Sequence, residues 1–276
     1  MPDKGVATKL LIHGCRGSVP SPSKQTVKYG GNTPCFEIQI GDMQLFFDTG
    51  TGFRTANIMA DTSKVLCFYS HFHHDHIQGL PFNPTLFNNA VDFTFTSGLI
   101  DKDSLKHTLK TYFSGGYFPL DIVTFLENLA FANIADVIES LKETVKIDWI
   151  ELNHPGGSIG YSVQAGQHKF VYLLDNEYQP EQRDALAAFC AGADIVAWDG
   201  MFTDAELPAK KGWGHSSMEQ ALSVKQSANI STMIIAHHNP SRTDEQLDIL
   251  ADSFSAENLH FAQDGLTYDF RSGIFK

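Results

Sequence analysis

Four side chains of metal-binding types stand within six residues: His71, His73, Asp75 and His76. The apolar run 65–69 comes directly before them and predicts a buried strand, so they lie in the loop that leaves it. His71 and His73 then project to the same side, because the side chains of an extended segment alternate. Imidazole and carboxylate suit Zn²⁺, Mn²⁺ or iron, and such a cluster is costly to bury without a metal. The segment therefore predicts a metal site.

Further polar residues follow other apolar runs that predict strands. These residues are His154, Asp175 and the adjacent pair His237 and His238. Ligand sites in α/β sheets gather where the strands end, so we expect these side chains to join the His-rich loop. The sequence pattern leaves open which of the two adjacent histidines faces the site. A fifth residue, Arg16, lies in a loop rich in Gly, Pro and Ser, and is either part of a plain turn or a contact for an anion.

The rest of the chain alternates predicted strands and helices, with no repeat and no linker. We expect one domain over 1–276, with a mostly helical, lid-like insertion at about 99–145. The aromatic residues at 112–120 surround a Gly-Gly pair and form either a lid over a pocket or a separate hydrophobic cluster. Helices are predicted at 180–190, 217–228 and 243–253. A final hairpin is predicted to pair 259–261 with 266–270.

The composition is that of an ordinary globular protein. The chain has a net charge of −12, which repels a polyanion at long range, so we expect a small anionic substrate and no extended nucleic acid. No apolar run reaches the roughly 18–20 residues that a membrane span needs. The first five residues lack the apolar core of a signal peptide, and the four cysteines form no CxxC pair. These features predict a cytoplasmic protein with reduced thiols.

The spacing His71-x-His73-x-Asp75-His76 resembles the signature of the metallo-β-lactamase family. The resemblance implies an α/β fold, an αββα sandwich of two mixed β-sheets flanked by helices. It also implies two divalent metal ions, zinc in the first place, with manganese or iron as alternatives. In this family pattern Asp48 supports the metal loop through hydrogen bonds, and His238 lies behind the ligands. The resemblance assigns His71, His73 and His154 to the first metal, Asp75, His76 and His237 to the second, and Asp175 to a bridge between them.

Other segments resemble the ribonuclease Z and cyclic-phosphodiesterase branch of this family. They are 14–18, 29–33, 154–161 and 213–216. In that branch a histidine matching His215 assists phosphodiester cleavage, although His215 also suits a plain helix start beside Ser216. Asp75 would act in catalysis through its metal. There is no separate Gly-rich basic arm of the kind that grips tRNA, which puts tRNA processing in doubt.

The resemblance implies a dinuclear-metal-dependent hydrolase. We expect a phosphodiesterase that cleaves a small or cyclic phosphodiester, such as a cyclic nucleotide or cyclic ribose phosphate, through a metal-bridging hydroxide. The alternatives are another ester class on the same site (lactone, thioester or β-lactam) and a non-catalytic, metal-binding regulatory module. A homodimer is compatible with the resemblance, because proteins of this branch are often dimers.

Overall fold

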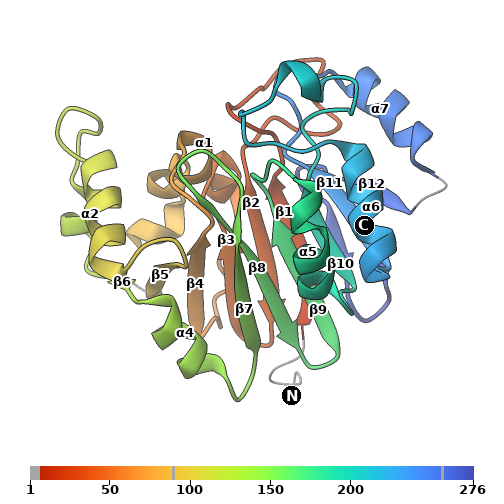
Figure 1. Ribbon diagram of the computed structural model, residues 1–276. Coiled ribbons are helices and arrows are strands. Elements are labelled where there is room, and N and C mark those ends of the chain that lie inside the picture. The colour runs from red at the N-terminus through yellow and green to blue at the C-terminus, as the bar shows by residue number, and fades with distance from the viewer. Residues whose placement is uncertain (1–6, 89–90, 256–257) are drawn as a thin grey trace.

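The fold is built on two β-sheets that pack face to face, with helices on the outer side of each (Figure 1). The structure is a computed structural model, and it describes residues 7–88, 91–255 and 258–276. This architecture confirms the predicted αββα sandwich. The first five residues, for which the sequence predicts no signal peptide, lie outside the described residues.

The first sheet has eight strands in the order β14-β13-β1-β2-β3-β4-β5-β6. It is mixed, because β13, β1, β2 and β3 pair antiparallel whereas β3 to β6 run parallel. The strands are β1 (Ala7–Gly14), β2 (Cys35–Ile40), β3 (Met43–Phe47), β4 (Lys64–Tyr69), β5 (Phe93–Ser97), β6 (Leu129–Phe131), β13 (Thr267–Asp269) and β14 (Ile274–Phe275).

The second sheet has six strands in the order β12-β11-β10-β9-β8-β7. It is also mixed, with β7, β8 and β9 antiparallel and β9 to β12 parallel. The strands are β7 (Lys146–Leu152), β8 (Ser158–Ala165), β9 (His168–Leu173), β10 (Ile195–Asp199), β11 (Thr232–Ala236) and β12 (Leu259–Phe261).

The predicted final hairpin is wrong. Strand β12 pairs with β11 in the second sheet, whereas β13 pairs with β1 in the first. The turn between them carries the chain from one sheet to the other. Its Ala262 amide donates to Ile235 of β11, and its Gly265 amide donates to Ile12 of β1. Strand pairing is decided by these long-range partners, which the local alternation of residues does not reveal.

Helices on the outer faces of the sheets complete the sandwich. Helices α5, α6 and α7 pack on the second sheet, and α2 and α3 pack on the first, beyond β4 and β5 (Figure 1). The side chains of Asp101 and Ser217 accept amide hydrogens of the first turn of α2 and α6, so the cap of α6 is Ser217 and not Ser216 as the sequence suggested. The helices are α1 (His74–Ile77), α2 (Lys102–Tyr112), α3 (Ile122–Phe125), α4 (Ile134–Leu141), α5 (Arg183–Cys190), α6 (Met218–Ala228) and α7 (Asp244–Ser253).

The main core lies between the two sheets. Phe47 and Phe68 of the first sheet stack together, and Phe47 also stacks on Tyr172 of the second, at a ring distance of 5.4 Å. Burial of such large rings is the dominant force that joins the sheets. None of the helices in the described part of the chain has the length and apolar character that a membrane-spanning segment requires.

The segment at 99–145 is not purely helical, because it also supplies β6 at the edge of the first sheet. Of its aromatic residues, Phe113 is buried in the hydrophobic cluster outside β4 and β5, with Phe118 packed against it. Tyr117 is 82% exposed. The cluster interpretation therefore describes Phe113 and Phe118, and leaves Tyr117 on the surface.

Candidate metal centre

The candidate site lies where the ends of several strands meet. Asp48 follows β3, Asp175 follows β9 and His237 follows β11, each within two residues of the strand. All three have positive φ, at 60°, 57° and 57°. A residue other than glycine in this left-handed region costs about 1–3 kcal/mol, and such strain gathers at functional sites. The chain therefore turns sharply at the end of each of these three strands, and a polar side chain lies at each turn.

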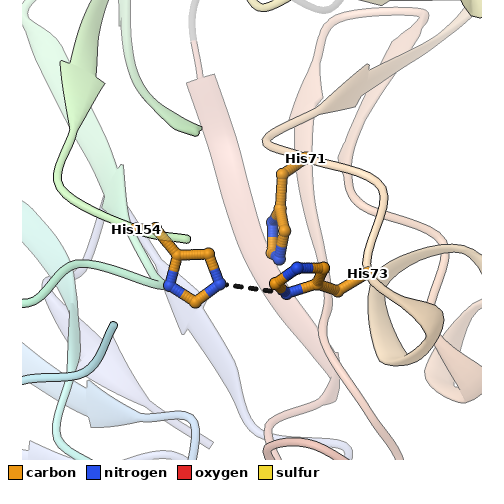
Figure 2. Close-up of side chains that lie close together, drawn as sticks. All are labelled: His71, His73 and His154. Atoms are coloured by element: carbon orange, nitrogen blue, oxygen red, sulfur yellow. Dashed lines mark hydrogen bonds between the residues drawn. The ribbon is translucent and has the colours of Figure 1, made fainter. Parts of the chain in front are cut away.

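A first group of donors consists of His71, His73 and His154. The first two follow β4, and the third follows β7 in the other sheet, so the rings approach each other from opposite sides (Figure 2). His154 Nε2 lies 3.0 Å from His73 Nδ1, and the rings of His71 and His73 are 4.4 Å apart. His73 is exposed whereas the other two are buried. Solvent and substrate therefore have access to this group on the His73 side.

A second group consists of Asp75, His76 and His237. Asp75 Oδ2 lies 3.2 Å from His237 Nε2 and 3.4 Å from His76 Nε2. The two histidines come from different sheets, and their Nε2 atoms are 3.4 Å apart. All three side chains are buried, so their donor atoms converge on one small volume away from bulk water.

Asp175 lies between the two groups. Its Oδ1 is 3.8 Å from His71 Nε2 and 3.7 Å from His154 Nε2. Its Oδ2 is 3.0 Å from His76 Nε2 and 3.3 Å from His237 Nε2. One carboxylate oxygen thus faces each group, which is the arrangement that a carboxylate needs to bridge two metal ions.

The chemistry of these donors fits divalent metal ions. His71 Nε2 and Asp175 Oδ2 are buried and have no hydrogen-bond partner among the described residues, although both point into the cluster. Burial lowers the pKa of His71 and His154, which favours the neutral imidazole that a metal requires. Burial alone would raise the pKa of Asp75, but His76 and His237 bring it well below its usual range. His71 and His154 therefore offer neutral imidazoles beside the charged carboxylate of Asp75. At His76, burial lowers the pKa, but Asp175, Asp75 and Asp48 raise it well above its usual value.

The outward-facing nitrogens of these histidines are held by fixed acceptors. His76 Nδ1 donates to Asp48 at 2.8 Å, and His154 Nδ1 donates to the Gly214 carbonyl at 2.8 Å. Such contacts orient the ring and leave the opposite nitrogen for a metal. Asp48 also accepts the amide and hydroxyl of Ser70 and the hydroxyl of Tyr172, all within 2.8 Å. Asp48 therefore lies where the sequence predicts, behind the metal loop.

His215 lies beside the cluster, with its ring stacked on that of His237 at 4.9 Å. Its Nδ1 donates to Asp199 at 2.8 Å. Burial lowers the pKa of His215, but the charge of Asp199 outweighs burial and raises it to about 9. Sequence reasoning assigned no role to Asp199, although it ends a strand just before a glycine. Asp48, which also follows a strand, was given its role through the family resemblance, and Asp199 had no such signal.

Of the two interpretations of Arg16, the structure supports a structural role in the turn and not a contact with a substrate anion. The guanidinium is fully buried and donates to the carbonyls of Gly30, Asn239 and Arg242, at 2.8–3.2 Å. These bonds join the loop after β1 to the segment after β11, and the guanidinium is thereby turned away from the cluster. Loop composition could not reveal this, because both carbonyl-bearing segments lie far along the chain.

Of the two adjacent histidines, His237 faces the cluster and His238 does not. His238 Nε2 lies 2.9 Å from the Ala262 carbonyl, and its ring stacks on Phe261 at 5.9 Å. Burial lowers the pKa of His238 to about 3, so the ring is neutral. The structure therefore places His238 in the packing behind β11, without contact to the substrate side of the site.

The loop after β1 supports the cluster through its backbone. The Ser18 amide donates to Asp75 Oδ2 at 2.8 Å, and Ser18 is itself in the left-handed region, with φ 64°. A Cβ on Gly17 would lie 2.6 Å from His237 Nδ1, so only a glycine allows the loop to lie against that ring. Sequence reasoning noted this loop for its resemblance and did not foresee either contact.

Comparison with known proteins agrees with this geometry. The profile of the family described as "Beta-lactamase superfamily domain" matches residues 43–238. The ribonuclease Z of Thermoplasma volcanium is 23% identical, with 95% of this chain and 97% of the relative covered.

Solved structures share the architecture along the whole chain. The metallo-β-lactamase fold protein YhfI from Bacillus subtilis is similar with a TM-score of 0.69 and 16% identity, over 95% of this chain and 99% of YhfI. A diphosphatase from the PhnP family is similar with a TM-score of 0.67 and 18% identity, over 96% of this chain and 98% of that one. The chain therefore belongs to the β-lactamase superfamily, with the metallo-β-lactamase fold and a likeness to ribonuclease Z.

Proposed function

We propose that the protein is a metal-dependent phosphodiesterase that cleaves a small or cyclic phosphodiester. The observation that carries the proposal is the position of Asp175, with one oxygen toward His71 and His154 and the other toward His76 and His237. Such a carboxylate would bridge two divalent ions, and the imidazole-rich donor set favours zinc over manganese or iron. His71, His73 and His154 would hold one ion, and Asp75, His76 and His237 the other.

Two metal ions in this position would activate water and neutralise charge on the phosphoryl oxygens. The protein's own residues supply the remaining steps. His215 lies at the edge of the cluster, and its Nδ1 donates to Asp199. The pKa of about 9 means that Nε2 also carries a proton at neutral pH, which it can donate first in a hydrogen bond to the phosphodiester and then to the departing alkoxide. Asp199 keeps the ring oriented for that transfer.

The choice of a phosphodiester is supported by two relatives and by the charge of the chain. The relatives are named a ribonuclease and a diphosphatase, both of which act on bonds to phosphorus. The net charge of −12 disfavours a long polyanion, whereas a small substrate can be captured locally by the metal ions. A short or cyclic phosphodiester satisfies both conditions.

The first test compares two neighbouring residues. The metal-reconstituted protein is assayed with bis(p-nitrophenyl) phosphate and with 2′,3′- and 3′,5′-cyclic nucleotides. We expect His237→Ala to lower both the bound metal and the turnover, the latter by about 100-fold or more. The matched variant His238→Gln keeps a donor for Ala262 and is expected to retain both metal and turnover. Metal content is measured by elemental analysis.

The proposal is wrong if the fully metallated wild-type protein cleaves none of these phosphodiesters. Equal metal loss in His237→Ala and His238→Gln would instead contradict the assignment of the ligands, because only His237 faces the cluster.

A further inference from the structure

A cavity of about 440 Å³ adjoins the metal centre at His215. Its size falls within the range of about 300–1,000 Å³ that small-molecule sites occupy. His215 is one of its lining residues and is also stacked on His237, so a group bound beside His215 lies close to the metal centre. Two segments form its walls, the one after Asp175 and the one between β10 and α6. The lining residues that matter here are Glu177, Tyr178, Leu207, Pro208, Lys210 and Lys211.

Two lysines and two carboxylates line this cavity: Lys210 and Lys211, with Glu177 and Asp204. Lys210 Nζ lies 4.0 Å from the centre of the Trp213 ring. Within the described residues, neither Lys210 nor Lys211 forms a salt bridge with a carboxylate. Both cations therefore remain available to an anionic ligand.

The two carboxylates of the lining are held by the protein and do not pair with the lysines. Glu177 accepts the amides of Gly212 and Gly214, at 2.8 and 3.0 Å, and Asp204 accepts the hydroxyl of Ser217. Glu177 thus fixes the loop that carries the lysines, and Asp204 fixes the start of α6. The two ammonium groups therefore remain as the cationic partners of an anionic ligand.

The rest of the lining is partly apolar and offers contacts to a flat or hydrophobic group. Tyr178, Leu207 and Pro208 line the cavity, beside the polar Gln179 and Gln220. A ligand that fits must therefore have two features, an apolar body and an anionic end. A nucleoside that carries a phosphate has both.

We propose that this cavity binds one arm of the phosphodiester substrate, and that this arm ends in a second anionic group. The apolar body of the arm packs between Tyr178 and Leu207, and its terminal phosphate binds Lys210 and Lys211. This inference rests on the proposed phosphodiesterase function, and it narrows the substrate to a short phosphodiester with an additional phosphate one nucleotide away. A substrate arm without a terminal phosphate makes no ionic contact with Lys210 and Lys211.

The test compares three thymidine dinucleotides, one without a terminal phosphate, one with a 5′ phosphate and one with a 3′ phosphate. We expect the wild-type protein to prefer one phosphorylated form over the unphosphorylated form in kcat/KM. In the double variant Lys210→Ala/Lys211→Ala this preference falls by about tenfold, chiefly through KM. Lys210→Arg/Lys211→Arg restores it, since the positive charge is retained.

The matched control is Lys102→Ala/Lys106→Ala on α2. It removes the same charge and also removes an ammonium that lies over an aromatic ring, 5.9 Å from Phe131. It should keep the wild-type preference. A preference that falls equally in both double variants, or in neither, overturns the inference, because the effect would then be general or absent.

A second measurement separates this inference from the proposed function. Calorimetry with thymidine 3′,5′-bisphosphate and with thymidine 5′-monophosphate needs no turnover. We expect the bisphosphate to bind the wild-type protein about tenfold more tightly than it binds Lys210→Ala/Lys211→Ala, with a smaller difference for the monophosphate. If no phosphodiester is cleaved but this difference is found, the cavity assignment stands without the reaction. Equal binding to both proteins overturns it.

Discussion

At the scale of single residues, charge placement decides what each imidazole does. His71 and His154 are buried against other histidines and are held neutral, as ligands must be. The pKa of His215 is shifted in the opposite direction, because the buried carboxylate of Asp199 is only 2.8 Å away. Burial lowers the pKa of His215 and Asp199 raises it, with a net value of about 9. The same side-chain type therefore suits metal binding at His71 and His154 and proton donation at His215.

The Asp199–His215 pair predicts the alkaline side of the pH profile. His215 keeps its proton at neutral pH and loses it as the pH rises through about 9, so activity should fall there. Asp199→Asn removes the charge that raises the pKa, while burial continues to lower it. We expect the alkaline limb of kcat/KM to move to lower pH and the activity at pH 8 to fall by about 10–100-fold.

The pH profile is measured beside that of Asp103→Asn, an exposed carboxylate on α2, which should match the wild type. An alkaline limb that stays in place in Asp199→Asn would show that another group controls it.

At the scale of elements, the loops after the strands hold the site in shape. Asp48, Asp175 and His237 adopt left-handed backbone conformations at strand ends, and Ser18 does so in the loop after β1. That loop is fixed by the buried guanidinium of Arg16, which ties it to the segment after β11. The strand ends therefore fix where the polar residues of the site lie, and the strained turns fix the directions in which their side chains point.

A substitution at Gly17 tests whether the loop after β1 holds His237 in place. A methyl group there would lie 2.6 Å from His237 Nδ1 and 2.5 Å from Met201 Cε. The methionine can move, but the His237 ring cannot move without leaving the second group of donors. We expect Gly17→Ala to weaken metal binding at the second group of donors by about 10–100-fold. The affinity is measured by titration with a competing chelator.

Gly116→Ala is the matched control, since a Cβ at Gly116 meets nothing within 4 Å. It should bind metal as the wild type does. Unchanged metal affinity in Gly17→Ala would mean that the loop is not held against His237 as the structure places it.

At the scale of the whole molecule, the site joins the two sheets. Its donors follow β4 in one sheet and β7, β9 and β11 in the other, so a metal ion would connect both halves of the sandwich. Tyr172 makes a related connection, from β9 to Asp48 behind β3. Because the ligands are in place only in the folded chain, metal binding must add to the free energy of unfolding.

Chelation should therefore lower the melting temperature. With the metal at about 100 times its Kd, the loss is about 2.7 kcal/mol, which for a chain of this size corresponds to a fall of about 5–10 °C. Added Zn²⁺ should restore the value. His71→Ala should melt at a temperature that chelation changes far less. A wild-type melting temperature that does not respond to verified metal removal would falsify the coupling.

The sequence by itself determined the local features of this protein. The spacing from His71 to His76 was sufficient to predict a metal loop after a strand, because side-chain type and strand periodicity are local properties. The resemblance of this spacing to the metallo-β-lactamase signature implied the sandwich fold, which the structure confirms, and the supporting place of Asp48.

Only the tertiary structure decided which distant groups meet. It showed that His237 faces the site and His238 does not, and that Arg16 donates to three carbonyls. It also showed that Asp199 binds His215 and that β12 and β13 belong to different sheets. Each of these outcomes depends on partners far apart in the chain. Their contacts follow from the packing of two sheets and from left-handed turns at strand ends, and residue type and spacing along a single chain do not specify them.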